Sequence, residues 1–283
     1  MSDQLFLPLP DADAYLRRIG IEEAASSLTP DKDLLDRLIY AHQTHVPFEN
    51  LDMCQLHVPS DLGIPALFDK VVTRRRGGYC FELNALFASL LEALHFDTRA
   101  VFCRIVNGHP DSEVRPSLHR GTLVKLDGVF HFCDVGYGGP MPAGSVPVID
   151  GYSGPVCGEE FCMDRLTEFA GISSGVAHPQ DDVYSWWRLS RRPDGPGSDK
   201  QKILEFNLFP QNNADFLPAN MWCSSDMSLF KKRIIINLRT ENGHRSITGD
   251  RLVIRDGDSC IEKEIENWDA CRVLLKEYFD LSV

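Results

Sequence analysis

The sequence predicts an α+β protein with three successive parts, because the spacing of its apolar residues changes twice along the chain. Up to about residue 95, apolar residues recur at helical spacing. From there to about residue 207, the chain reads as strands rich in apolar and β-branched residues. The remainder combines strands with a final helix. We therefore expect parts at residues 1–95, 96–205 and 206–283.

Two segments of the first part carry the clearest helical patterns. One begins after the acidic Asp31 and ends before Pro47, because proline removes a backbone donor and clashes with the preceding turn of a helix. The other begins at Cys80, and the polar Glu82 and Ser89 fall off its apolar stripe. The members of that stripe are Leu83, Leu86, Phe87, Leu90, Leu91 and Leu94.

The second part contains strand and turn signals. Residues 98–106 predict a strand, and Asp127-Gly128 predicts a tight two-residue turn between two more strands. Residues 139–158 are rich in Gly and Pro and predict irregular structure. Residues 191–198 predict a surface loop or linker.

The third part ends the chain with a hairpin and a helix. Residues 233–240 and 244–255 predict strands, and Asn242-Gly243 between them is a strong signal for a two-residue hairpin turn. Residues 267–279 predict the final helix. No internal repeat or low-complexity tract interrupts the three parts.

The composition is that of an ordinary globular protein, with 43% apolar and 25% charged residues in a chain of 283. The 41 acidic residues outnumber the 29 basic ones, and the net charge of −12 argues against nucleic-acid binding and against docking on an anionic membrane. The N-terminus lacks the basic start and apolar run of a secretion signal, so we expect a cytoplasmic protein. Nine cysteines are scattered without a Cys-x-x-Cys pair, so neither a disulfide framework nor a metal site is expected.

Cys80 is the strongest candidate for a catalytic nucleophile. It follows Gly77-Gly78-Tyr79 and begins a predicted helix. A thiol at a helix N-terminus faces unpaired backbone N–H groups and the positive end of the helix dipole, and both favour the thiolate. If Cys80 is the nucleophile, the chain should also supply a base and a group that orients the base.

The hairpin around Asp127-Gly128 supplies such a pair. With these two residues as the turn, His119 and Asp134 project from the same face as diagonal neighbours, roughly 7–8 Å apart at the backbone. At that separation a carboxylate can reach an imidazole. His131 projects from the opposite face and cannot replace His119. Cys80, His119 and Asp134 therefore form a candidate thiol, base and orienting carboxylate.

Each of these residues also has a structural interpretation. A lone cysteine is most often a small buried hydrophobe, and a lone histidine is more often structural than catalytic. Asp134 could simply start a turn. The run Gly136–Gly139 follows a strand but lacks the Gly-Lys-Ser/Thr ending and the following helix of a phosphate loop. The catalytic interpretation gains its weight from the helix start and the shared hairpin face.

At these residues the chain resembles the arylamine N-acetyltransferases. The most specific match is residues 75–84, Arg-Arg-Gly-Gly-Tyr-Cys-Phe-Glu-Leu-Asn. Residues 46–51 match the family's Pro-Phe-Glu-Asn motif, and residues 15–20 are similar to its N-terminal signature. Residues 134–139 are similar to its Asp-Val-Gly-Phe-Gly-Gly segment. The segment from His119 is similar to the strand that carries its catalytic histidine.

The resemblance implies a helical bundle bearing Cys80, a β-barrel bearing His119 and Asp134, and an α/β lid, with a Cys-His-Asp triad like that of cysteine proteases. It implies a ping-pong reaction in which acetyl-CoA acetylates Cys80, CoA leaves, and an arylamine or arylhydrazine takes the acetyl group, with no metal. Phe48 would line the aryl pocket, and Tyr137 stands where the family has phenylalanine. The candidate CoA contacts are Ser117, Gly136, Trp222, Ser225 and Ser228.

Three other functions compete with this one. Relatives of the same fold act as amide synthases that close macrolactams on a carrier-bound polyketide. A cysteine peptidase or transglutaminase-like enzyme uses the same triad. A binding module could keep the fold without activity, although the intact set of Cys80, His119 and Asp134 argues against it.

Overall fold

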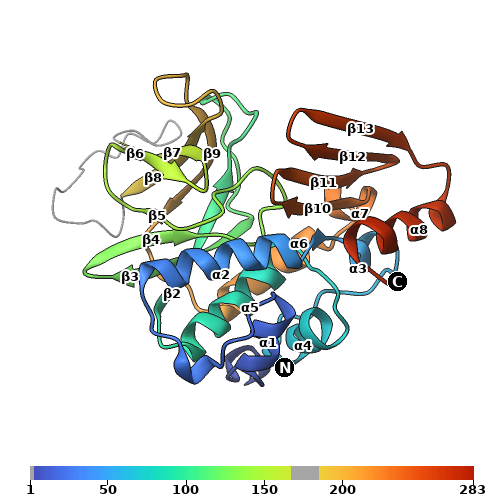
Figure 1. Ribbon diagram of the computed structural model, residues 1–283, viewed down its shortest axis with the longest axis horizontal. Coiled ribbons are helices and arrows are strands. Elements are labelled where there is room, and N and C mark those ends of the chain that lie inside the picture. The colour runs from blue at the N-terminus through green and yellow to red at the C-terminus, as the bar shows by residue number, and fades with distance from the viewer. Residues whose placement is uncertain (1–2, 167–184) are drawn as a thin grey trace.

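The computed structural model of the protein describes residues 3–166 and 185–283. Within them the elements form three groups (Figure 1): helices at the bottom, a barrel-like sheet at the upper left, and a smaller sheet with the C-terminal helix at the upper right. The predicted α+β class with three parts is confirmed. The part boundaries at residues 95 and 205 remain a proposal.

The helical group is built around two long helices, α2 (Lys32–His45) and α5 (Cys80–Ala93). The side chain of Asp31 accepts the backbone N–H of Leu34 at 2.8 Å and so caps α2, which ends before Pro47 as predicted. Short helical segments surround them. These are η1 (Asp3–Phe6), α1 (Ala12–Arg18), η2 (Ala25–Ser27), α3 (Leu51–Cys54), α4 (Ile64–Phe68) and η3 (Asp69–Thr73).

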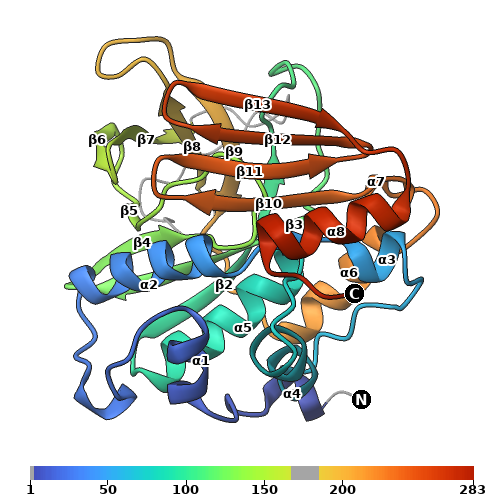
Figure 2. The same ribbon diagram turned by 45° about the vertical axis from the view of Figure 1, so that its right-hand side comes forward.

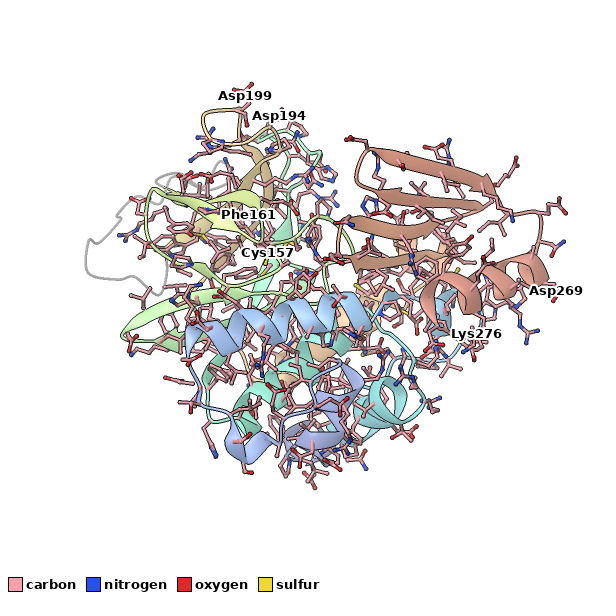
Figure 3. All side chains as sticks on the ribbon, viewed as in Figure 1. Cys157, Phe161, Asp194, Asp199, Asp269 and Lys276 are labelled. Atoms are coloured by element: carbon pink, nitrogen blue, oxygen red, sulfur yellow. The ribbon has the colours of Figure 1, made fainter. Side chains whose placement is uncertain are left out.

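The barrel-like sheet has eight strands among the described residues, in the order β5-β4-β3-β2-β9-β8-β7-β6. They are β2 (Asp97–Ile105), β3 (His119–Leu126), β4 (Val129–Cys133), β5 (Val146–Pro147), β6 (Tyr152–Val156), β7 (Glu159–Leu166), β8 (Trp186–Arg192) and β9 (Gln201–Asn207). The wholly buried Phe161 belongs to the core of this sheet (Figure 3).

One expectation for this region needs correction. Residues 139–158 are not irregular throughout, because they contain β5 and β6. These are the two edge strands, where the missing N–H groups of Pro147 and Pro155 cost no internal ladder bond. The surface loop predicted at residues 191–198 is confirmed from residue 193 on, and it connects β8 to β9 of the same sheet rather than linking separate parts. Asp194 and Asp199 mark that connection in Figure 3.

The third group is a five-stranded sheet in the described chain, with the order β1-β10-β11-β12-β13. Its later elements are η5 (Asn213–Phe216), α6 (Leu217–Cys223), α7 (Leu229–Lys232), β10 (Ile235–Thr240), β11 (Gly243–Thr248), β12 (Arg251–Asp256), β13 (Ser259–Glu264) and α8 (Trp268–Phe279). The predicted final helix is thus confirmed, with Asn267 as its N-cap. Figure 2 shows α8 lying along this sheet beside α3.

The predicted hairpin in this sheet is displaced by one residue. Thr240 pairs with Gly243, so Glu241 and Asn242 form the loop, and neither has the positive φ that a type I′ turn requires. Gly243 instead allows the backbones of β11 and β12 to approach closely, since a Cβ there would lie 2.3 Å from the carbonyl oxygen of Arg255. The single strand expected over residues 244–255 is two strands, separated by a turn at Gly249, whose φ is +64°.

Strand β1 (Phe48–Glu49) ties the first group to the third. It comes from the helical part of the sequence but pairs with β10, through Phe48 with Asn237 and Glu49 with Ile236. Phe48 is also bridged to Gly78, just before Cys80. The motif at residues 46–51 therefore lies between the candidate nucleophile and the smaller sheet.

No helix within residues 3–166 and 185–283 is both long enough and apolar enough to span a membrane.

Candidate active site

Cys80 is the first residue of α5, as predicted. The backbone N–H of Tyr79 donates to Oε2 of Glu82 at 3.0 Å, which closes the first turn of the helix. Gly77, three residues before Cys80, must be a glycine for steric reasons, because a Cβ there would lie 2.0 Å from the carbonyl oxygen of Pro47. The Gly-Gly pair therefore lets the chain pass beneath the segment that bears Phe48 and enter the helix at Cys80.

A buried network of five charged side chains fixes this helix start. Nζ of Lys70 lies 2.9 Å from Oε2 of Glu82 and 2.7 Å from Oδ2 of Asp52. Nη2 of Arg76 lies 2.7 Å from Oε1 of Glu49 and 2.8 Å from Oδ1 of Asp52. Burial lowers the pKa of Lys70, but the attraction of Glu82 and the other carboxylates outweighs this and raises it overall. The network joins the two matched motifs, at residues 46–51 and 75–84.

The hairpin that carries the base forms in the predicted register. Asp127 and Gly128 both have positive φ, +49° and +84°, as a type I′ turn requires. Leu126 then pairs with Val129, and the ladder continues outward to Thr122 and Cys133, so Asp134 lies one residue beyond the last pair. Nε2 of His119 lies 2.5 Å from Oδ2 of Asp134, and both side chains are buried.

His131 lies away from this pair, as expected. It is part of the same β3–β4 hairpin, but its Nδ1 lies 3.4 Å from Oγ of Ser145. Ser145 in turn donates to Oδ1 of Asp36 at 2.6 Å. His131 therefore belongs to a separate polar contact and leaves His119 as the imidazole beside Asp134.

Asn84 connects α5 to the hairpin and was not singled out from the sequence. Its Nδ2 donates to Oδ1 of Asp134 at 2.8 Å and to the carbonyl oxygen of Arg120 at 2.6 Å. Its Oδ1 accepts the backbone N–H of Val135 at 2.9 Å. Asn84 stands four residues after Cys80, one helical turn along the same face, and this spacing is the signal that could have identified it.

Burial dominates the electrostatics of Cys80, which is only 2% exposed. It raises the pKa of the thiol well above its usual value, and the nearby Cys223 and Asp134 raise it further. The nearby backbone N–H groups of Arg120 and Phe81 act in the opposite direction and lower the pKa of the thiol. The helix-start argument alone, which favoured the thiolate, therefore underestimated desolvation.

Gly136 lies against the nucleophile. A Cβ at this position would lie 2.9 Å from Cα of Cys80 and 3.0 Å from Nδ2 of Asn84. Its backbone N–H donates to Oδ1 of Asp134 at 2.8 Å. Of the proposed CoA contacts, Gly136 is thus the one packed directly on Cys80.

Phe48 and Tyr137 lie together beside the hairpin. The rings of Tyr137 and His119 meet edge to face at 5.6 Å. Phe48, Tyr137 and Asp134 line one cavity of about 30 Å³, which has room for a water molecule but not for an aryl ring. A bound aromatic substrate would require this cavity to widen.

A polar cleft adjoins that cavity. It has a volume of about 660 Å³ and shares Gly139, Asn237 and Arg239 with the smaller space. Its walls also include Arg191, His244 and Arg255. Arg239, His244 and Arg255 face one another across β10, β11 and β12, so basic side chains form a row across this face of the sheet.

None of the proposed CoA contacts, Gly136 included, lines either of these spaces. Ser117 stands two residues before His119. Its Oγ accepts a hydrogen bond from Nε of Arg104 at 3.2 Å. Trp222 is about half exposed on α6, and Ser228 caps α7 through the N–H of Phe230. Oγ of Ser225 is buried without a hydrogen-bond partner. The α6 segment nevertheless approaches the site, because Oδ1 of Asn220 accepts the hydroxyl of Tyr79.

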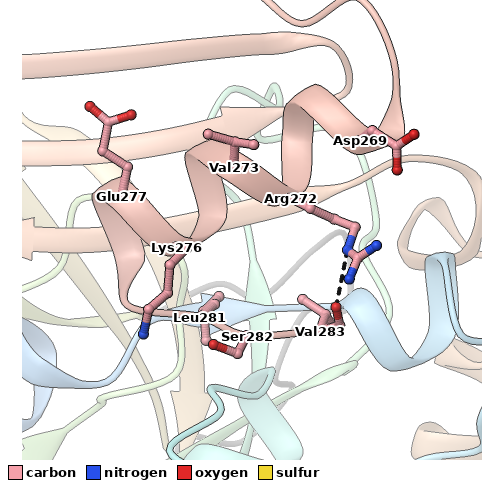
Figure 4. A pocket seen from close by; sticks show the side chains of 8 residues that line it. All are labelled: Asp269, Arg272, Val273, Lys276, Glu277, Leu281, Ser282 and Val283. Atoms are coloured by element: carbon pink, nitrogen blue, oxygen red, sulfur yellow. Dashed lines mark hydrogen bonds between the residues drawn. The ribbon is translucent and has the colours of Figure 1, made fainter.

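Another cavity, of about 620 Å³, lies at the C-terminus and contains none of the predicted site residues. Figure 4 shows Arg272 of α8 beside Val283, with Nε of Arg272 donating to the carbonyl oxygen of Val283 at 3.1 Å. Among residues 3–166 and 185–283, no group of three or more His, Cys, Asp or Glu side chains is arranged to hold a metal ion.

Comparison with known sequences identifies relatives along most of the chain. The family model described as N-acetyltransferase matches residues 31–283. The arylamine N-acetyltransferase of Mycobacterium bovis is 37% identical over 185 residues, which cover 64% of each chain. Human arylamine N-acetyltransferase 1 is 27% identical over 286 residues, covering 96% of this chain and 94% of the human one. The alignment thus spans slightly less than two thirds of the length of the mycobacterial relative.

Solved structures agree over the full fold. The arylamine N-acetyltransferase from M. tuberculosis superposes with a TM-score of 0.81 at 27% identity, covering 95% of this chain and 93% of that one. The enzyme from Mycobacterium marinum, solved in complex with CoA, gives a TM-score of 0.80 at 26% identity, with 95% and 92% covered. The chain belongs to the arylamine N-acetyltransferase family.

Proposed function

We propose that the protein transfers the acetyl group of acetyl-CoA to arylamines and arylhydrazines by a ping-pong mechanism through acetyl-Cys80. One observation carries the proposal: the buried His119–Asp134 hydrogen bond of 2.5 Å is held by Asn84 against the start of α5, where Cys80 is the first residue. Among the relatives, the family name and the CoA complex of the M. marinum protein support this choice of acyl donor.

In the first half-reaction, His119 takes the proton of the Cys80 thiol. The thiolate attacks the thioester carbonyl of acetyl-CoA, and a tetrahedral oxyanion forms. Backbone N–H groups at the helix start supply positive ends of dipoles for that oxyanion. The carbon–sulfur bond to CoA then breaks, CoA leaves with the proton from the His119 imidazolium, and Cys80 keeps the acetyl group.

In the second half-reaction, the neutral amine attacks the carbonyl of acetyl-Cys80. His119 takes the proton of the amine, the bond to Sγ breaks, and the proton returns to the thiolate. Asp134 holds the imidazole in one orientation throughout and stabilises its charged form. Phe48 and Tyr137 would bind the ring of the acceptor once their cavity widens.

For the acyl donor, the polar cleft offers arginine side chains suited to the phosphates of CoA. Gly136 would flank the acetyl group, and Ser117, Trp222, Ser225 and Ser228 remain candidates for contacts on the α6–α7 side. Arg255→Ala and Trp222→Ala separate these two routes. The substitution that removes a contact with the nucleotide part of CoA should raise the KM for acetyl-CoA. It should leave the KM for acetylpantetheine unchanged, because acetylpantetheine lacks the nucleotide phosphates.

The deciding experiment is an intact mass measurement after incubation with acetyl-CoA alone. We expect a mass increase of one acetyl group, which is discharged when an arylamine is added. Cys80→Ala should abolish the adduct. Cys223→Ala is the matched control, because Cys223 is another buried thiol near the site. The absence of an adduct on the wild-type protein would rule out the acetyl-Cys80 intermediate.

The same experiment distinguishes the competing functions. A cysteine hydrolase or transglutaminase-like enzyme would lose an acyl adduct to water, or never form one from acetyl-CoA. An amide synthase would form its adduct only from a longer carrier-bound acyl chain. Rapid discharge to a simple arylamine such as aniline, with slow loss in its absence, is expected only for the transferase.

A further inference from the structure

Arg120 is a buried cation next to the candidate base. It is 2% exposed, and within residues 3–166 and 185–283 its guanidinium forms no salt bridge with a carboxylate. A buried charge without an ionic partner is costly and uncommon. The residue stands directly after His119 on β3, but its side chain points to the other face of the strand.

The immediate surroundings of the guanidinium are aromatic and neutral. It lies over the ring of Phe216 at 4.6 Å, and Nη2 donates to Oδ1 of Asn213 at 2.8 Å. Nε has no acceptor. Burial lowers the pKa of Arg120 to about 10, against the attraction of Glu92 and Cys80, so the group stays charged at neutral pH.

The backbone of the same residue lies near the nucleophile. Its N–H group lowers the pKa of the Cys80 thiol, and its carbonyl oxygen accepts a hydrogen bond from Nδ2 of Asn84 at 2.6 Å. The ring beneath its guanidinium, Phe216, packs at 5.8 Å on Phe81, the residue after Cys80. Cys80, Phe81 and Phe216 belong to one buried cluster. The cation and the thiol are therefore separated by apolar groups, which screen their interaction less than water does.

We propose that Arg120 is a positioning residue whose buried positive charge stabilises the thiolate of Cys80 during acyl transfer. The inference rests on the assignment of Cys80 as the nucleophile. It accounts for a cation kept in the interior without a salt bridge to a carboxylate among the described residues: Glu92 attracts it without forming one, and the thiolate of Cys80 would be a second anion. It would help the thiol to ionise although Cys80 is almost wholly buried.

Other titratable groups face Cys80 and act on it together with Arg120. His119 from β3 supplies a second positive charge when protonated. Asp134 opposes the thiolate. The neutral thiols of Cys103 on β2 and Cys223 on α6, and the hydroxyl of Tyr79, complete the set. None of these side chains changes in the variants below, so they affect every variant equally.

The test compares Arg120→Gln with Arg120→Lys. Both lose the planar fork over Phe216, but only Gln loses the charge. Arg99→Gln is the matched control, because Arg99 also lies 4.6 Å over an aromatic ring, that of Phe130, and donates to a backbone carbonyl elsewhere on the barrel. Alkylation of Cys80 by iodoacetamide is followed against pH, with peptide mass mapping to separate Cys80 from the other eight cysteines.

We expect the alkylation profile of Arg120→Gln to move up by about one pH unit, which slows the reaction about tenfold at neutral pH. Arg120→Lys should restore most of the wild-type profile, and Arg99→Gln should match the wild type. Equal profiles for Arg120→Gln and Arg120→Lys would overturn the proposal. If both variants are less stable, the comparison still decides, because the loss of packing is common to them and the charge is not.

Failure of this inference can be told apart from failure of the proposed function. If the acetyl adduct forms on Cys80 but the Gln and Lys profiles coincide, the function stands and the role of Arg120 falls. If the profiles differ as expected but acetyl-CoA leaves no adduct, Arg120 acts on Cys80 and the acetyl transfer is wrong.

Discussion

Lys70 provides the sharpest test of how the site is supported. Its ammonium lies between the carboxylates of Glu82 and Asp52, at 2.9 and 2.7 Å, and its side chain is only 7% exposed. Lys70→Met removes the positive charge and keeps most of the aliphatic stem. The buried Glu82 and the partly buried Asp52 then have fewer partners, and Glu82 is the carboxylate that accepts the backbone N–H of Tyr79 at the start of α5.

The expected loss of stability follows from this burial. Removing one partner of a buried ion pair leaves an uncompensated charge and costs about 3–5 kcal/mol of unfolding free energy. Lys276→Met is the control, because Lys276 of α8 (Figure 3) pairs with Asp280 just beyond the helix, and both side chains are more than half exposed. An exposed pair of this kind contributes about 0–1 kcal/mol.

Urea unfolding followed by tryptophan fluorescence measures both variants against the wild type. The midpoint should fall clearly for Lys70→Met and hardly at all for Lys276→Met, with similar m-values. The rate of Cys80 alkylation should also change in the Lys70→Met protein, because Glu82, which holds the first turn of α5, loses its ion pair with Lys70. If the two lysine variants lie within about 1 kcal/mol of each other, the buried network does not stabilise the helix start as argued.

Three further outcomes follow from the site and the core. Asp134→Asn should reduce turnover by about 10²–10⁴ with an unchanged circular dichroism spectrum, whereas His131→Ala should retain much of the activity; near-normal turnover in Asp134→Asn would contradict the assigned role. Gly136→Ala should displace Cys80, because the added Cβ would lie 2.9 Å from Cα of Cys80. The rate of Cys80 acetylation should then fall about a hundredfold. An unaffected rate would show that the backbone shifts to accommodate the methyl group without moving the thiol. Burial lowers the pKa of His42 to about 3, and the charge of Arg18 adds to this effect. Below about pH 6.5 the unfolded chain therefore takes up a proton that the folded protein excludes. The free energy of unfolding should decrease as the pH is lowered from about 6.5 to about 3. His42→Phe should remove up to about 1.4 kcal/mol per pH unit from that slope in urea titrations, and an unchanged slope would assign the acid sensitivity to other groups.

The accuracy of the sequence predictions depended on how local their signals were. Asp127-Gly128 has the backbone angles of its turn type, and it brings His119 to Asp134 because the register follows from the turn. Asn242-Gly243 carries an equally strong signal but does not form that turn. Gly243 is required because a Cβ there would clash with the carbonyl oxygen of Arg255 on the neighbouring strand. Arg255 lies twelve positions later in the chain, so the local sequence does not show this contact.

The sequence by itself determined the α+β class, the helix that begins at Cys80, the hairpin pair of His119 and Asp134, and a family resemblance that the comparisons confirm. These depend on periodicity, turn chemistry and short motifs, all of which act between neighbours in the chain. Only the tertiary structure decided the electrostatics of the site. Burial raises the pKa of Cys80 on α5, and Arg120 on β3 is buried without a salt bridge to a carboxylate of the described chain. Desolvation and charge coupling depend on segments far apart in sequence, so no local pattern could have supplied them.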